Sequence, residues 1–192
     1  MTEELALDVT TTALVVIDIQ KGIAEDPSLK PYSAREVIAN VSKLLGAFRK
    51  RNMPVFLVRI ELASPIALSP ESDLPPLDPL DSPPGFADLV PEMTPIPSDI
   101  IITKRQWGAF YGTELDLQLR RRDIRTIVLC GIATEYGVEG TARSAYEHGY
   151  RQVFAEDAMT AASAETHTMV VNAILKRLGR VRSTGEIIEE LG

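Results

Sequence analysis

Residues 126–143 constrain the fold more than any other segment. They begin with the uninterrupted apolar run TIVLC, which is typical of a strand buried on both faces. Gly131 follows directly, and a helical pattern begins near Tyr136 within the sequence GIATEYGVEGTAR. This order of strand, turn and helix places free N-terminal amide groups of a helix at the carboxyl end of a strand. Open α/β sheets bind their ligands at that edge.

Strands and helices are predicted to alternate along the whole chain. Ser33 and Glu36 have the spacing of a capping box at the start of the clearest helix, and Thr113 and Thr184 are the predicted caps of two others. The alternation predicts an α/β fold, a doubly wound three-layer α/β/α arrangement with a mostly parallel sheet of about six strands. Strands are predicted at 12–18, 54–60, 99–103, 126–130, 152–157 and 180–183, and helices at 33–51, 114–123, 136–148, 163–178 and 184–191.

Length and charge narrow the class of protein. A chain of 192 residues with 45% hydrophobic content suits one domain, residues 1–192, with a sizeable core. The net charge of -7 argues against nucleic-acid and membrane partners. No apolar run approaches the roughly 20 residues needed to cross a bilayer, and the N-terminal residues lack the apolar core of a signal peptide. With a single cysteine, the chain forms no internal disulfide, and a cytoplasmic location is expected.

Neither a metal nor an organic cofactor is expected. Two histidines and one cysteine are too few for a zinc site of the usual type. The glycines around residue 131 lack the spacing of both the Walker motif and the dinucleotide-binding motif.

Residues 61–99 contain 10 of the 13 prolines and follow no regular period. A loop this long in a compact domain is typical of a functional lid or of a disordered insertion. An ordered lid or an oligomer contact is favoured, because the segment has apolar side chains to bury. These are Ile66, Leu68, Leu74, Leu77, Leu80, Phe86, Leu89, Val90 and Met93.

Two charged residues follow predicted strands and should converge on the Gly131 turn. Asp18 ends the run VVID, where it either caps the next turn or acts as a general acid or base. Lys104 ends the run IITK; alone it would be a surface residue, but beside Asp18 it becomes a charge partner.

The remaining reactive residues have ordinary interpretations. Cys130 lies inside a predicted strand and is expected to be an inert core residue. His148 is expected to be solvated, and His167 to be a surface or interface residue. Arg143 is either half of a structural ion pair or a ligand for a carboxylate.

Three motifs in this order and spacing resemble the isochorismatase-like hydrolase superfamily, also called the cysteine hydrolases. The resemblance implies a parallel sheet of about six strands, a homo-oligomer and a cis peptide bond between Ile132 and Ala133. Two members of the superfamily's catalytic set of Asp, Lys and Cys correspond to Asp18 and Lys104. The motifs are VVIDIQ at 15–20, KRQWGAFYGTELD at 104–116 and GIATEYGVEGTARSAYEHGY at 131–150, followed by EDAMTAAS at 156–163.

The resemblance places the superfamily's nucleophilic cysteine at Gly137. Cys130, seven residues earlier and within the strand, is no substitute. Amide hydrolysis through a covalent acyl intermediate is therefore not expected. Nicotinamidase metal ligands are also missing, since RIELASP contains no histidine. Some true isochorismatases carry glycine at this position, and they cleave a vinyl ether without a nucleophilic side chain.

Ether cleavage is accordingly favoured over C–N hydrolysis, with Asp18 as the acid, Lys104 as its partner and Gly137 leaving room for substrate or water. Two alternatives stay open: an inactive member that binds a small carboxylate or serves as an interaction module, and an amidase that uses activated water. Binding of a small carboxylate with a ring requires cationic side chains near the carboxylate and aromatic side chains against the ring. The predicted substrate-binding residues are Gln20, Arg59, Arg105, Trp107, Phe110, Ile132, Ala133, Thr134 and Tyr136.

Overall fold

A computed structural model describes residues 7–62, 70–73 and 83–192. Part of the proline-rich segment therefore lies outside the described residues, including Ile66, Leu68, Leu74, Leu77 and Leu80. The described remainder of that segment contains the 3₁₀ helix η2 (Pro91–Met93) and buries Val90 and Met93 in the core.

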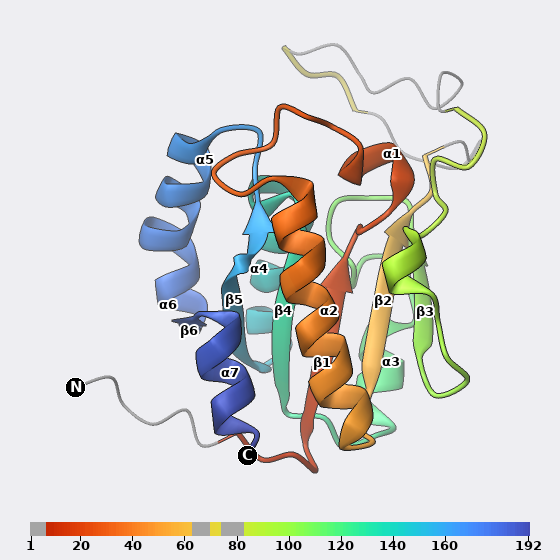
Figure 1. Cartoon of the computed structure of the whole chain (residues 1–192), viewed down its shortest axis with the longest axis vertical. Helices are drawn as coiled ribbons and strands as arrows, with labels where there is room; N and C mark the ends of the chain where they lie inside the picture. The colour runs from red at the N-terminus through yellow and green to blue at the C-terminus, as the bar shows by residue number, and fades with distance from the viewer. Residues whose placement is uncertain (1–6, 63–69, 74–82) are drawn as a thin grey trace.

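The centre of the molecule is a six-stranded parallel sheet (Figure 1). The predicted α/β class and the number of strands are confirmed. All six residues of the central strand β1 are buried, as expected for an apolar strand covered on both faces. The order is β3-β2-β1-β4-β5-β6, with β1 Thr12–Ile17, β2 Val55–Ile60, β3 Ile100–Lys104, β4 Thr126–Ile132, β5 Arg151–Thr160 and β6 Arg180–Arg182.

Helices cover both faces of the sheet. In Figure 1, α2 (Ala34–Lys50) and α7 (Thr184–Glu190) lie in front of it, whereas α3 (Leu115–Arg120) and α4 (Glu139–Glu147) lie behind. A continuous helical segment packs against α4 and consists of α5 (Ala164–Met169), the π-helical stretch η4 (Val170–Leu175) and α6 (Lys176–Leu178). The short α1 (Lys21–Ala24) follows β1. Among the described residues, no helix is long and apolar enough to span a bilayer.

Several local predictions are confirmed or corrected. The capping box of Ser33 and Glu36 is present at the start of α2. The prediction that Thr184 caps the last helix was wrong: Ser183 is the cap, because its side chain accepts the amide of Glu186. Thr113 is not the N-cap of α3, although its hydroxyl accepts the amide of Leu115.

Some element boundaries also differ from the predicted ones. Strand β5 extends three residues beyond the predicted end to Thr160, since Gly131 and Ile132 of β4 pair with its extra length. Helical structure after β4 begins at Thr134 as the π-helical turn η3 (Thr134–Val138), two residues earlier than predicted.

The strand order fixes where the chemistry is found. It runs outward from β1 through β2 to β3 on one side, and from β4 through β5 to β6 on the other. The order of the chain therefore reverses between β1 and β4. In doubly wound sheets, the crevice at the carboxyl ends of such a strand pair is the usual ligand site.

Candidate functional site

Asp18 directly follows β1 at this reversal point. Its residue is only 3% exposed, and its backbone φ is 51°, in the left-handed region. Burial raises the pKa of the Asp18 carboxyl to about 6, and the nearby Lys104 ammonium opposes that rise. Within the described part of the chain, the buried Oδ1 atom of Asp18 has no hydrogen-bond partner. A buried oxygen in this condition is available to a substrate or a water molecule.

Lys104 brings the opposite charge from two strands away. It is the last residue of β3, and its side chain is completely buried. Its Nζ atom lies 2.7 Å from Oδ2 of Asp18 and 3.2 Å from the carbonyl oxygen of Gln106. Because β3 and β1 end at the same edge of a parallel sheet, the long lysine side chain reaches the aspartate past the end of β2. The predicted convergence of Asp18 and Lys104 is therefore observed.

The turn after β4 supplies the third side of the site. Gly131 has φ 122°, and a Cβ atom there would lie 2.0 Å from the carbonyl oxygen of Ile17, so only glycine permits this approach of β4 to β1. The peptide bond between Ile132 and Ala133 is cis, as the resemblance implied. The π-helical turn η3 then begins at Thr134.

Gly137 lies in this turn and faces the charged pair. A Cβ atom built at Gly137 would lie 3.0 Å from Oδ2 of Asp18 and 3.6 Å from Nζ of Lys104. It would also lie 2.7 Å from a methyl group of Ile17, closer than real Cβ atoms come. The backbone of Gly137 therefore packs directly against Ile17 and the charged pair, and no room for a side chain is left at position 137.

Two predicted aromatic residues flank the turn on the molecular surface. Trp107 is 59% exposed and Tyr136 is 43% exposed, and their ring centroids lie 5.0 Å apart. Tyr136 precedes Gly137 in the chain, and Trp107 follows Lys104 by three residues. The ring pair therefore belongs to the same region as the charged pair.

The other predicted binding residues on the turn differ in their access to solvent. Ile132 and Thr134 are buried, and Ala133 is partly exposed. The Thr134 hydroxyl lies 3.1 Å from the carbonyl oxygen of Thr160, which ties the turn to β5.

Two predicted binding residues, Gln20 and Phe110, make contacts within the protein. The amide nitrogen of Gln20 donates to the carbonyl oxygens of Ile60 and Phe86, and its oxygen accepts the amide of Ile60, so its side chain joins chain segments. Phe110 is buried against His148 and Tyr150 at the end of α4, which is the opposite edge of the sheet. Ligand binding by Gln20 and Phe110 stays a prediction.

The side chains of the predicted arginines form hydrogen bonds or ion pairs with other residues of the protein. Arg59 donates from Nε to the hydroxyl of Thr103 at 3.1 Å, and Arg105 forms an ion pair with Glu61 at 3.4 Å. Arg143 forms an ion pair with Glu139 one turn away on α4, which resolves the two interpretations left open for it.

Cys130 and His148 follow their predictions, but His167 does not. Cys130 is fully buried, and burial raises the pKa of its thiol. His148 is exposed at the end of α4. The prediction that His167 is a surface or interface residue was wrong: it is 2% exposed and lies between Thr134 and Glu156. No local pattern indicated this, because its partners are 33 and 11 residues away and only the fold brings them together.

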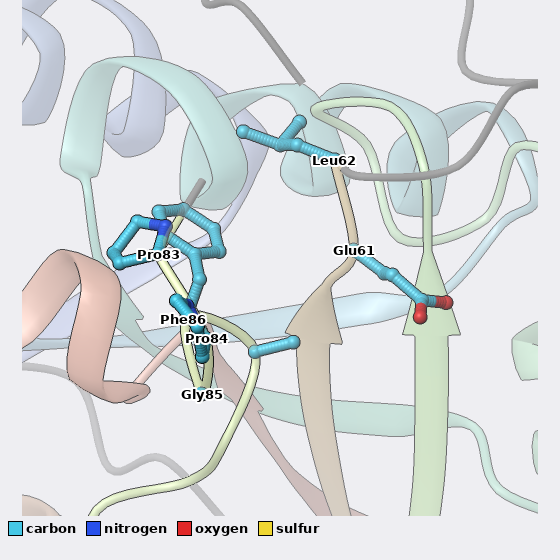
Figure 2. A pocket seen from close by; sticks show the side chains of 7 residues that line it. Glu61, Leu62, Pro83, Pro84, Gly85 and Phe86 are labelled. Carbon is cyan, nitrogen blue, oxygen red and sulfur yellow. The ribbon is translucent and has the colours of Figure 1, made fainter. Parts of the chain in front are cut away.

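A pocket of about 230 Å³ lies beside the end of β2 (Figure 2). Glu61 and Leu62 form one wall, and residues 83–87 form the other. The ring of Phe86 packs on the backbone of Gly22, and its carbonyl accepts the Gln20 amide, so this wall is attached to the segment that follows Asp18.

The arrangement joins a carboxyl group of raised pKa, a buried ammonium group and an adjacent backbone turn that has no side chain at position 137. Such a set can transfer a proton to a bound substrate and stabilise the charged form of the acid that remains. Over the described ranges, no group of three or more His, Cys, Asp or Glu side chains is placed to hold a metal ion.

Fold and site together define a doubly wound α/β protein whose reactive groups gather at the carboxyl edge of the sheet. The isochorismatase domain family matches residues 12–186, and the chain belongs to this family of hydrolases. It is 48% identical to the uncharacterized isochorismatase family protein YecD of Escherichia coli O157:H7, with 97% of this chain and all of YecD covered. It is 44% identical to the uncharacterized family protein YwoC of Bacillus subtilis, with both chains fully covered. An isochorismatase family protein from Burkholderia thailandensis has a similar structure, with a TM-score of 0.91 and 41% identity over 96% of this chain and 97% of that one.

Proposed function

We propose that this chain is a hydrolase that acts without a cysteine nucleophile and cleaves a vinyl ether such as isochorismate. The observation that carries the proposal is the buried ion pair of Asp18 and Lys104, which faces a glycine at position 137 and not a nucleophilic side chain. A covalent acyl mechanism needs a nucleophilic side chain at this point, and glycine has none. Vinyl ether hydrolysis needs an acid and a water molecule instead.

Asp18 acts first as the general acid. In its protonated form it donates its proton to the methylene carbon of the vinyl ether, and an oxocarbenium ion results. Water adds to the cationic carbon and returns a proton to Asp18. The hemiketal then breaks its bond to the ether oxygen that is attached to the ring, and its hydroxyl proton passes to that oxygen, so pyruvate and the ring alcohol are released. The raised pKa of Asp18, about 6, supports this role, because a fraction of the carboxyl groups is protonated near neutral pH.

Lys104 and the turn assist the same step. The ammonium group 2.7 Å from Asp18 stabilises the carboxylate that remains after proton donation. Trp107 and Tyr136 are close enough to each other to form one wall for a ring-shaped substrate. A homo-oligomeric assembly and a cytoplasmic location remain part of the proposal.

The test is pyruvate release from isochorismate, measured beside hydrolysis of a panel of small amides. Asp18→Asn keeps the shape of the side chain but removes the acid. Asp123→Asn is its matched control, since Asp123 also has a positive φ, 52°, and is exposed on the surface. Release that is lost in Asp18→Asn and kept in Asp123→Asn supports the proposal.

Three other outcomes contradict it in different ways. Release that persists in Asp18→Asn removes Asp18 from the mechanism. Amide turnover without pyruvate release favours the amidase that uses activated water. No turnover of any substrate favours an inactive member that binds a small carboxylate or another protein.

A further inference from the structure

A buried histidine lies directly behind the turn that faces Asp18. His167 sits on α5, and both of its ring nitrogens have partners. Its Nδ1 atom lies 2.9 Å from the hydroxyl of Thr134, and its Nε2 atom lies 3.0 Å from Oε1 of Glu156. The proposed mechanism does not use this residue, yet a buried polar ring with two hydrogen bonds is a costly feature to maintain without a role.

Hydrogen bonds link Thr134, His167 and Glu156 in that order, and Tyr32 fixes the Glu156 end. The Tyr32 hydroxyl lies 3.1 Å and 3.0 Å from the two carboxyl oxygens of Glu156. Hydrogen bonding from His167 lowers the pKa of Glu156 more than burial raises it. Glu156 is therefore a carboxylate that only accepts hydrogen bonds, so the hydrogen between it and the imidazole belongs to Nε2. The hydrogen bond to Glu156 fixes the orientation of the imidazole ring. The Tyr32 ring packs edge-on against the imidazole, with the ring centroids 6.0 Å apart.

The near end reaches the turn itself. Thr134 is the first residue of η3, and it is fully buried. The amides of Tyr136 and Val138 both donate to the carbonyl oxygen of Ala133, which directly precedes Thr134. Gly137 stands between these two amides. A shift of Thr134 would therefore move the backbone that faces Asp18.

We propose that His167 is a positioning residue: held by Glu156, it fixes Thr134 and so keeps Gly137 at its distance from Asp18. It acts through Thr134 and does not touch the substrate. The inference rests on the proposed role of the Asp18 site, but it concerns the geometry of the turn, which can be measured without any substrate.

Two substitutions separate the contacts of the ring. The side-chain amide of Asn lies close to the Nδ1 position of histidine and can present its oxygen there, so His167→Asn can keep an acceptor for Thr134 and loses Glu156. The amide nitrogen of Gln lies close to the Nε2 position, so His167→Gln keeps the contact with Glu156 and loses Thr134. His148→Gln, at the exposed histidine on the end of α4, is the control.

Hydrogen exchange of the Tyr136 and Val138 amides is the first readout. We expect exchange about tenfold faster in His167→Gln, the scale of one lost buried hydrogen bond, and less than about threefold faster in His167→Asn and His148→Gln. Equal exchange in all variants and the wild type would overturn the proposal. So would equal acceleration of exchange throughout the protein in both His167 variants, which marks general destabilisation.

A second pair of variants keeps the test decisive if a His167 variant does not fold. Thr134→Val removes the hydroxyl without changing the shape, and Thr134→Ser retains it. Thr134→Val also removes the hydrogen bond to Thr160, so faster exchange at Tyr136 and Val138 supports the proposal when adding His167→Gln to Thr134→Val accelerates it no further. Further acceleration in that double variant, or identical exchange in Thr134→Val and Thr134→Ser, contradicts it.

Turnover provides the final readout once a substrate is established. The proposal requires a kcat about tenfold lower in His167→Gln with KM nearly unchanged, and recovery of most of the loss in His167→Asn. Altered exchange without any turnover in the wild type would leave the positioning role standing and refute the proposed substrate.

Discussion

Asp18 combines a strained backbone with a buried carboxyl group. Its φ of 51° lies in a region that non-glycine residues rarely occupy, although aspartate tolerates it better than most. Such strain costs on the order of 1 kcal/mol and persists where surrounding contacts hold it, often at functional sites. Here the contacts are the hydrogen bond from the Asp18 amide to the carbonyl oxygen of Val58 and the ion pair with Lys104.

The first prediction concerns pH. The pKa of Asp18 is raised to about 6, and the general acid must be protonated to react. We expect kcat/KM for vinyl ether cleavage to be highest below about pH 6 and to fall about tenfold per pH unit above it. A pH–rate profile between pH 4.5 and 8.5 checks this. A flat profile, or one that rises with pH, would be incompatible with Asp18 as the acid.

The second prediction concerns the close packing at residue 137. In Gly137→Ala, the new methyl group must displace the Ile17 methyl or the Asp18 carboxylate. We expect a loss of about 1–3 kcal/mol of unfolding free energy and at least about a tenfold loss of kcat/KM. Denaturant titration and pyruvate release measure the two effects.

Gly46→Ala is the matched control for this change. Gly46 is exposed in the middle of α2, and a Cβ atom there has no neighbour within 4 Å among the described residues. Alanine should stabilise the protein by about 0.5–1 kcal/mol and leave activity unchanged. Wild-type activity in Gly137→Ala would show that the reaction does not depend on a glycine at this position.

Among the elements, α2 has the best defined N-terminus. Ser33 accepts the amide of Glu36, and the Glu36 carboxylate accepts the amide of Ser33, which satisfies two free donors of the first turn. The same box recurs at Ser183 and Glu186 of α7, which packs against α2. Both helices cover the same face of the sheet (Figure 1). Helix α2 begins near the carboxyl edge of the sheet, and α7 begins after the last strand, β6.

The third prediction follows from this cap. Ser33→Ala should lower the unfolding free energy by about 1 kcal/mol, because one backbone donor loses its partner. Ser42→Ala within the same helix is the control, since its hydroxyl bonds only to the carbonyl four residues earlier and alanine is the better helix former there. Urea unfolding compares the two, and equal midpoints would refute the assigned cap.

At the scale of the whole molecule, the strand order concentrates the site. Asp18, Lys104 and the η3 turn come from three strands, and the parallel direction of those strands brings their ends to one edge. The same edge carries the exposed rings of Trp107 and Tyr136. Exposed aromatic rings of this kind are often covered by a ligand or by another subunit.

The fourth prediction is that the protein forms a homo-oligomer in solution. Light scattering after size exclusion should give a mass that is a multiple of the 21.1 kDa chain. Trp107→Ser and the exposed but separate Leu117→Ser then form a matched pair that asks whether the aromatic rings contribute to assembly. A mass of one chain at all concentrations would refute the prediction.

Local sequence was sufficient for most of the secondary structure. Apolar runs and helical periods depend on neighbours within a few residues, so the six strands and the Ser33 box could be predicted. The caps at Ser183 and Glu114 were missed by one residue, since adjacent polar residues are equally suitable caps and only backbone geometry distinguishes them.

Sequence by itself therefore determined the elements and their alternation, and it placed Asp18 and Lys104 at the ends of predicted strands. Gly137 was singled out by the resemblance to the hydrolase superfamily. Only the tertiary structure decided which side chains surround them. The side chains of Gln20 and Phe110 contact distant parts of the protein, and His167, predicted to be a surface or interface residue, is buried. Those contacts join residues that are far apart in the chain, and packing, not local pattern, sets them.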